Sequence, residues 1–226
     1  MPQIKISKII RSKRKSLALA ISSDATLIVR APMKTSLEYI EKIVAQKSDW
    51  IARKMREIQR WPKAIEKKFI AGEEFSYLGE KYQLEITESL KIKLNKNSDC
   101  KELFFPKVFL WRAKERMFGW YKKQALQEIS SRAETIAQKL NLNYQSIKIS
   151  SAKTNWGSCG PKNSLNFNWR LIMAPESVIE YVIIHELTHI LEKNHSRKFW
   201  NKVEAVMPEY KKRRKWLREN GKMLVL

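Results

Sequence analysis

Apolar and polar residues alternate over residues 4–29, on both sides of a Ser-Ser-Asp sequence. Leu19 and Ile21 share one face of the run before these turn residues, and Leu27 and Val29 continue the alternation after them. A period of two is typical of half-buried strands, and Ser and Asp favour turns. The pattern predicts a β-hairpin.

Apolar residues then recur at helical intervals as far as Trp61-Pro62. They are Leu37, Ile40, Ile43, Val44, Ile51, Met55 and Ile58. This spacing predicts one long amphipathic helix over about residues 36–60. Short strand-like runs, separated by Gly72 and Gly79, follow up to about residue 110. Residues 1–110 are therefore expected to form a strand-rich N-terminal unit with one long helix.

The pattern changes after residue 110, where helical periodicity continues for roughly 30 residues. Strand patterns return at 146–150 and at Leu165–Ile172. Pro175 suits the start of a further helix, and Ser196 suits the N-cap of the next one, before a final basic helix. We expect residues 111–226 to form a second, compact unit. The expected fold class is α+β.

The chain is strongly basic, with a formal net charge of +22. Such a field favours nucleic acid, anionic lipid or acidic protein as a partner, and composition does not choose among them. The run from Lys211 to Lys215, with Trp216 beside it, could contact phosphate and stack on a base. An exposed face of a terminal helix with a packed Trp is the alternative explanation.

Two classes of protein are not expected from the composition. No apolar run approaches the ~20 residues that a membrane span requires, and the two cysteines are too few for a disulfide framework. The start of the chain also lacks the unbroken apolar run of a secretory signal. These features predict a cytoplasmic protein without a membrane span.

All three histidines of the chain lie in one short stretch, HELTHILEKNH. His185 and His189 are four residues apart, so on a helix their imidazoles lie on one face and can converge on one ion. Glu186 lies beside them, within reach of a metal-bound water. An HExxH motif of this kind predicts a zinc hydrolase with one zinc ion per chain and with Glu186 as the general base.

The third metal ligand has two candidates. His195 is favoured, because the helix is expected to end near residue 194 and the chain can then bend the next side chain back toward the ion. Glu192 is the rival, since it lies three residues beyond His189 and a carboxylate also serves zinc. A purely structural role for the three histidines is disfavoured, because Glu186 would be costly on a helix flanked by so many apolar residues.

Several segments around these residues resemble the YgjP-like metallopeptidase family, which is related to the SprT-like zincins. They are WGSC, LNFNWRLIMAP, YVIIHELTHILEKNHSRKFW and MPEYKKRRKWL, at 156–159, 165–175, 181–200 and 207–217. The resemblance implies a zinc-dependent hydrolase with His185, His189 and His195 as ligands and Glu186 as the catalytic residue. Glu192 stands where metzincins carry Gly, so the resemblance places the chain with compact zincins outside that group.

Candidate substrate-binding residues lie on both sides of this motif. The strand at Leu165–Ile172 could pair with an extended peptide as an edge strand, and Asn166 and Asn168 on it could bond the substrate backbone. Tyr210 is a candidate oxyanion donor. Cys159 is more simply a small buried residue, although an upstream Cys joins HExxH as a metal ligand in peptide deformylases.

We therefore expect a zinc-dependent metallopeptidase that acts on a peptide or protein substrate. One alternative is a nucleic-acid-associated protein, including a protease of DNA-bound proteins, that uses the basic surface. Another is a zinc amidohydrolase that acts on small substrates.

Overall fold

The computed structural model describes residues 4–22, 24–59, 66–96, 101–152 and 155–226. Its packing divides the chain into two compact units, Met1–Lys63 and Ala64–Leu226. Each unit has a hydrophobic core of its own. The α+β class is confirmed, because the described residues form six α-helices and three small sheets.

The division does not fall at residue 110, where the change of pattern placed it. Apolar residues on both sides of that position, such as Phe105 and Met117, belong to one core. Tyr121 also donates a hydrogen bond to the carbonyl oxygen of Ser76, at 2.8 Å. The strands within residues 74–106 therefore pack with the part of the chain after residue 110. Only the first sheet and the helices after it form a separate unit.

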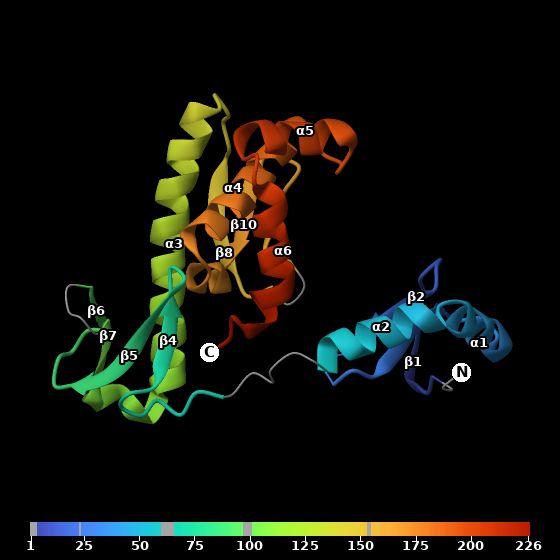
Figure 1. Cartoon of the computed structure of the whole chain (residues 1–226), viewed down its shortest axis with the longest axis horizontal. Coiled ribbons are helices and arrows are strands. Elements are labelled where there is room, and N and C mark those ends of the chain that lie inside the picture. The colour runs from blue at the N-terminus through green and yellow to red at the C-terminus, as the bar shows by residue number, and fades with distance from the viewer. Residues whose placement is uncertain (1–3, 23, 60–65, 97–100, 153–154) are drawn as a thin grey trace. The chain divides into compact units, whose positions relative to one another are not determined.

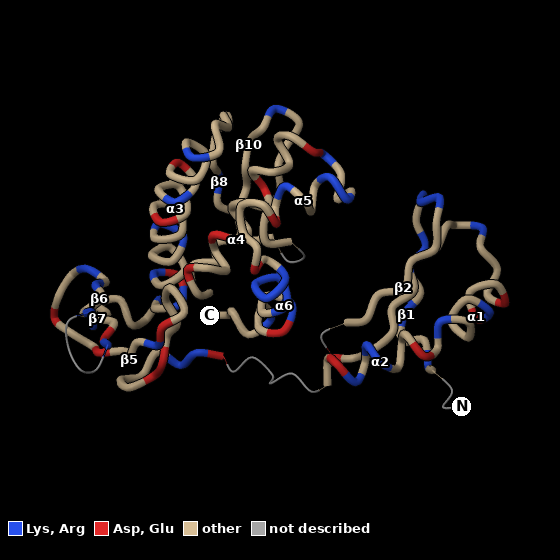
Figure 2. The backbone as a smooth tube through the Cα atoms, turned by 45° about the horizontal axis from the view of Figure 1, so that its top comes forward, with Lys and Arg blue, Asp and Glu red and all other residues tan. Residues whose placement is uncertain are grey.

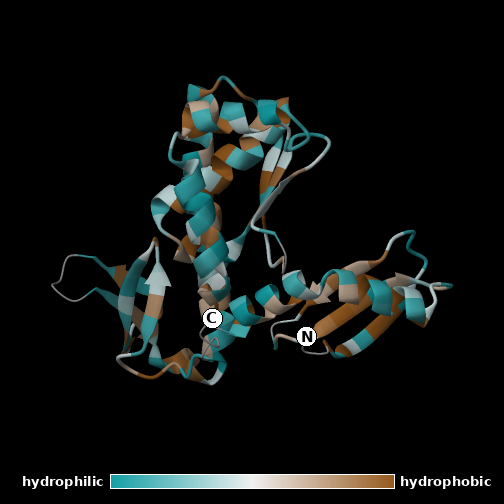
Figure 3. Cartoon of the chain, turned by 45° about the vertical axis from the view of Figure 1, so that its right-hand side comes forward, coloured by the Kyte–Doolittle hydropathy of each residue, from teal (hydrophilic) through white to brown (hydrophobic). Residues whose placement is uncertain are grey.

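The first unit holds a three-stranded sheet (Figure 1). Its strands are β1 (Ile6–Ser12), β2 (Ala18–Ile21) and β3 (Leu27–Pro32), in the order β1-β3-β2. The predicted hairpin is confirmed, since β2 and β3 pair antiparallel, and β1 joins the other side of β3 in parallel. Figure 3 shows these strands as strongly hydrophobic. Leu27, Val29 and Ala31 of β3 are fully buried.

The single long helix expected over residues 36–60 is wrong, because two helices occupy this region. They are α1 (Leu37–Gln46) and α2 (Ser48–Gln59). Between them Lys47 leaves helical geometry, with φ −105° and ψ 13°, and Ser48 and Asp49 are residues that favour a helix start. Ile40 and Ile51, from the two helices, are buried in the same core. The apolar spacing therefore continues through the break and does not reveal it.

The second unit begins with a four-stranded sheet of order β4-β5-β7-β6. The strands are β4 (Glu74–Tyr77), β5 (Glu80–Thr87), β6 (Lys93–Asn95) and β7 (Glu102–Pro106). A 3-10 helix, η1 (Lys107–Arg112), leads into the long helix α3 (Ala113–Lys139). One side of α3 is buried along its whole length, through Ala113, Met117, Tyr121, Ala125, Ile129, Ala133 and Ala137. This spacing of four residues fixes the face that packs on the core.

The small sheet of the second unit has the order β8-β10-β9. Its strands are β8 (Ser146–Ser150), β9 (Gly157–Cys159) and β10 (Ser164–Asn168). The strand predicted over Leu165–Ile172 ends early, because Trp169–Met173 forms the 3-10 helix η2. The Asn168 side chain accepts a hydrogen bond from the backbone N–H of Arg170 and so caps η2. In addition, β10 lies in the centre of the sheet, and β9 lies at its edge.

Three α-helices complete the second unit. They are α4 (Glu176–Leu191), α5 (Arg197–Val206) and α6 (Tyr210–Asn220), before a short 3-10 helix, η3 (Gly221–Met223). The helix expected after Pro175 and the N-cap expected at Ser196 are both confirmed. α4 packs against α3, β9, α5 and α6 (Figure 1). No helix in the described part of the chain is long and apolar enough to cross a membrane.

Candidate metal centre

Helix α4 is hydrophobic on all sides, as expected of a helix inside a core. Two of its buried residues, Glu186 and Thr188, are polar. The Thr188 hydroxyl donates to the carbonyl oxygen of Ile184 at 2.7 Å, so its burial is compensated within the helix. Glu186, by contrast, makes no hydrogen bond with any described residue, although it is 4% exposed. A buried carboxyl group without a partner points to a chemical role.

Three imidazoles converge at the C-terminal end of α4. The Nε2 atom of His195 lies 2.9 Å from that of His185 and 3.2 Å from that of His189. All three ligand nitrogens lie within 4.8 Å of one another. Nitrogen ligands around a tetrahedral zinc, at ~2.0 Å from the ion, lie about 3.3 Å apart. The arrangement therefore fits a metal ion with little movement of the rings.

The rings are held by aromatic packing from α5. Phe199 is fully buried, and its ring centroid lies 4.9, 4.6 and 4.8 Å from those of His185, His189 and His195. Trp200 stacks on His195 at 5.7 Å. Ser196 caps α5 by accepting a hydrogen bond from the N–H of Phe199 at 3.3 Å. This cap sets the start of α5 directly after His195, which brings His195 back toward α4.

Hydrogen bonding fixes which nitrogen of His189 faces the centre. Its Nδ1 lies 3.0 Å from the backbone carbonyl oxygen of Glu192. Donation of Nδ1–H to this carbonyl leaves the lone pair of Nε2 free for a metal, as is usual around ligating histidines. Glu192 therefore orients the His189 ring through its backbone carbonyl oxygen. Its carboxylate is not in the convergent group found among the described residues, whose third member is His195.

Burial and neighbouring charges favour the neutral form of two of the imidazoles. Burial lowers the pKa of His185 to about 3, with further lowering by His189, His195 and Arg214. The pKa of His195 is also lowered, first by burial and then by His189 and Arg214. Neutral imidazole is the form that binds metal ions.

Glu186 lies against the backbone of β9. A Cβ atom built on Gly157 would stand 2.5 Å from Oε1 and 2.6 Å from Cγ of Glu186, so only glycine leaves room for this carboxyl group. Burial raises the pKa of Glu186 to about 8. A divalent cation at the neighbouring imidazoles would favour the carboxylate form. No local sequence pattern indicated this contact between Gly157 and Glu186.

The other candidate residues are placed in different ways. The Asn168 amide donates to the carbonyl oxygens of Ala152 and Asn155, at 2.7 and 3.3 Å, so its hydrogen bonds are already used inside the protein. Tyr210 is buried, with its ring stacked on Trp200 at 5.3 Å. A substrate contact by Asn166, Asn168 or Tyr210 stays a prediction.

Cys159 is half-buried and is absent from the convergent group of the described residues. Burial raises the pKa of its thiol. A neutral thiol is a poor metal ligand, since the thiolate is the form that binds. This position favours the packing role of Cys159.

The basic run on α6 is partly neutralised. Lys211 pairs with Glu204 at 3.1 Å, and Lys212 and Arg213 both pair with Glu209. Figure 2 shows the basic residues of this helix. Trp216 packs against the core and is not a free stacking surface. Nucleic-acid binding by this run stays a prediction.

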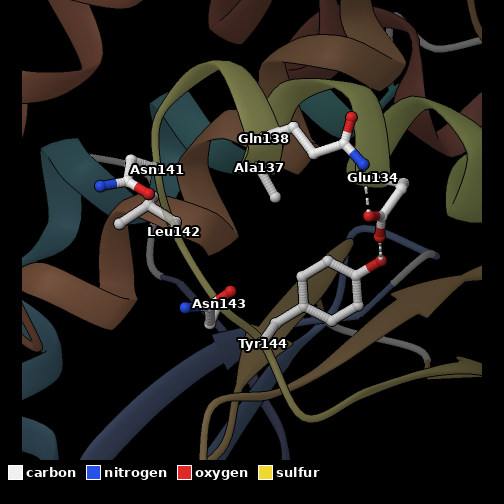
Figure 4. Close-up of a pocket in the computed structure, with 7 residues that line it drawn as sticks. All are labelled: Glu134, Ala137, Gln138, Asn141, Leu142, Asn143 and Tyr144. Atoms are coloured by element: carbon white, nitrogen blue, oxygen red, sulfur yellow. Dashed lines mark hydrogen bonds between the residues drawn. The ribbon is translucent and has the colours of Figure 1, made fainter.

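A separate hollow of about 350 Å³ lies where α3 ends (Figure 4). Its polar groups are bonded to one another. The Tyr144 hydroxyl donates to Glu134 at 2.8 Å, and the Gln138 amide donates to the other oxygen of Glu134 at 2.8 Å. None of the convergent histidines lines this hollow, so it does not form part of the candidate metal centre.

Comparison with known proteins identifies one family, and the solved structures that match include two metallopeptidase zymogens. The family described as YgjP-like, metallopeptidase domain, matches residues 15–220. A metallopeptidase zymogen, jannalysin of Methanocaldococcus jannaschii, is 27% identical, with a TM-score of 0.35 over 38% of this chain and 89% of its own. Another, abylysin of Pyrococcus abyssi, is 23% identical, with a TM-score of 0.38 over 42% and 94%. A search of curated proteins gives no match.

Proposed function

The chain belongs to the YgjP-like metallopeptidase family, and from that premise we propose that it hydrolyses peptide bonds with one zinc ion. The family makes the protein a metal-dependent peptidase. The proposed ligands are His185, His189 and His195, and the proposed general base is Glu186. The substrate is a peptide or protein.

The observation that carries this proposal is the convergence of the three Nε2 atoms on one point. The Nε2 atom of His195 lies 2.9 Å from that of His185 and 3.2 Å from that of His189. Without a cation, neutral imidazoles at these distances have more nitrogen lone pairs facing the centre than N–H groups to donate to them. A cation satisfies all three lone pairs together. Three nitrogen ligands also leave a fourth position open, which is the arrangement of catalytic rather than structural zinc.

A bound zinc ion supplies Lewis-acid chemistry, since it lowers the pKa of a coordinated water and polarises the scissile carbonyl. The chain supplies the proton transfer. Glu186 follows His185 directly on α4 and lies about 100° round the helix axis from it. In this proposal its carboxylate takes a proton from the attacking water. It then returns that proton to the leaving amine. Burial of Glu186 excludes competing water from this carboxylate.

The sheet edge beside Glu186 offers a place for the substrate backbone. β9 pairs with β10 on one side only, and its sheet order places it at the edge. Because an edge strand has unpaired N–H and C=O groups, an extended peptide can add to it by main-chain hydrogen bonds. In this proposal β9, rather than β10, carries the substrate.

Metal analysis together with the Glu186→Gln variant tests the proposal. We expect about one equivalent of zinc per chain in both proteins, since Glu186 is not a ligand. Peptide hydrolysis by the variant should fall by about 10²–10⁴-fold, because the general base is lost. His189→Ala is the matched variant that should lose the metal as well as the activity.

Two results would contradict the proposal: wild-type protein purified without chelators that holds no zinc, or full hydrolysis by Glu186→Gln. Loss of zinc in Cys159→Ser would instead support the amidohydrolase alternative with a Cys ligand. On the geometry of the described residues, we expect Cys159→Ser to keep its zinc.

A further inference from the structure

Arg214 lies beside the candidate metal centre without a carboxylate partner. Its guanidinium carbon sits 4.6 Å from the ring centroid of Trp200. The same ring lies 5.7 Å from those of His185 and His195. Trp200 thus connects the guanidinium of α6 to the imidazoles of α4 and α5.

Three neighbouring basic residues have acidic partners, whereas Arg214 has none. Lys211 pairs with Glu204, and Lys212 and Arg213 share Glu209; Lys215, like Arg214, forms no ion pair with a described residue. Among the described residues no Asp or Glu lies within ion-pair distance of Arg214, and it is exposed to solvent. Stacking on Trp200 holds its guanidinium without using the N–H donors, which stay available to a ligand.

An unpaired cation is unfavourable beside a site for a divalent cation. Trp200, on which Arg214 stacks, also packs on His185 and His195, so that one ring separates the guanidinium charge from these imidazoles. Electrostatic repulsion from this charge acts against a metal ion at the same imidazoles. An anionic group bound between Arg214 and the metal would remove this cost. Guanidinium is well suited to that task, because it binds carboxylates in a planar, bidentate manner.

The surroundings of the site have the same sign of charge. Arg197 and Lys198 come after Ser196, the residue that follows His195, and both are exposed. Neither forms an ion pair within the described part of the chain. Glu186 is buried, so it does not neutralise this surface. A basic rim of this kind attracts acidic ligands and repels basic ones.

We propose that Arg214 binds a carboxylate of the peptide substrate, so that this enzyme prefers peptides with a negative charge close to the scissile bond. The inference rests on the proposed peptidase function and names the class of its substrates. The carboxylate has two possible sources, an Asp or Glu side chain and a free C-terminus. Arg214 is then a specificity-determining residue.

The test measures peptide binding to the zinc-loaded Glu186→Gln variant by calorimetry. The probes are four versions of one short peptide, with either Glu or Gln at a central position and with either a free or an amidated C-terminus. We expect the peptide with both carboxylates to bind about tenfold or more tightly than the peptide with neither, as for a hydrogen-bonded charged group. The Gln versions identify a side-chain carboxylate, and the amidated versions identify the terminal one.

Second substitutions in the same background assign the preference to Arg214. Arg214→Gln should abolish the preference, and Arg214→Lys should retain part of it, because the charge remains but the planar pair of donors is lost. Arg218→Gln is the matched control, since Arg218 lies one turn further along α6 and its one ion pair with a described residue is the contact with Glu219, at 3.7 Å. It should leave the preference unchanged. Zinc affinity should stay the same or increase in Arg214→Gln.

Equal binding of all four peptides would overturn the inference. So would a carboxylate preference that persists in Arg214→Gln, because the metal alone would then bind the carboxylate. Loss of zinc from Arg214→Gln would show a structural role and would also overturn it. Failure of the peptidase proposal is distinguishable: wild type would then fail to hydrolyse peptides that the variant still binds. Hydrolysis without any carboxylate preference would remove this inference alone.

Discussion

Gly157 lacks a side chain at the point where β9 meets the carboxyl group of Glu186. The two residues are far apart in sequence, and an added Cβ would stand 2.5 Å from the nearer carboxyl oxygen. A carboxyl group at the end of a flexible side chain can move away from such a contact. The position of the Glu186 carboxyl group, the proposed general base, is therefore more sensitive to this glycine than the stability of the fold.

We predict that Gly157→Ala lowers kcat/KM for peptide hydrolysis by about tenfold or more, because a displacement of about 1 Å at a reacting group has an effect of this size. Zinc content and unfolding temperature should change little. Gly119→Ala is the matched control, since nothing lies within 4 Å of a Cβ built on Gly119, inside α3. It should keep full activity and gain up to about 1 kcal/mol of stability. Equal activity of the two variants would contradict the prediction.

Single residues were also the scale at which the sequence was most informative about chemistry. His185 and His189 had to share a face of any helix that contained them, because four residues complete about one turn. The structure confirms that geometry. Other contacts at the site join different elements, and no local pattern indicates them. Gly157 of β9 contacts Glu186, and Phe199 and Trp200 of α5 contact the histidine rings. Their contributions therefore required the tertiary structure.

Helix α5 determines where the third histidine lies. Its N-cap, Ser196, follows His195 directly, and Phe199 packs against all three imidazoles. A change in the start of α5 should therefore displace His195 from the other two rings. Cap residues typically contribute about 1 kcal/mol to stability.

We predict that Ser196→Ala destabilises the second unit by about 1 kcal/mol and weakens zinc binding, measured by chelator competition. Ser36→Ala is the matched control, since Ser36 caps α1 in the first unit by accepting a hydrogen bond from Tyr39. It should cause a similar loss of stability and no change in zinc affinity. Equal zinc affinities in the two variants would show that the α5 cap does not position His195.

Among the elements, α3, α4 and the N-cap of α5 agreed with the sequence, whereas two boundaries did not. The break at Lys47 was invisible because α1 and α2 bury the same apolar face. The end of β10 at Asn168 was invisible because residues 169–173 are as apolar as the strand before them. Hydrophobic periodicity reports which side is buried, and hydrogen bonds decide where an element ends.

The whole molecule consists of two units with separate cores, and the three histidines all lie in the second one. A ligand that binds only the folded form stabilises the unit that holds it. At a free concentration 100 times the dissociation constant, this effect is about 2.7 kcal/mol. Metal binding should therefore act on one part of the molecule and not on the other.

We predict that a chelator lowers the hydrogen-exchange protection of the second unit and leaves that of the first unchanged. Residue-resolved hydrogen exchange of the full chain measures both together. His185→Ala should remove the effect of the chelator, because it removes a ligand. A uniform loss of protection in both units after chelation would contradict the prediction.

The sequence by itself determined the chemistry and the secondary-structure class, because HExxH spacing and apolar periodicity are properties of neighbouring residues. It also predicted a third metal ligand near the end of the helix, with His195 favoured over Glu192. The tertiary structure alone decided where the chain divides, which strand forms the sheet edge, and which side chains surround Glu186. Those features depend on contacts between segments distant in sequence, whose free energies arise only when the core assembles.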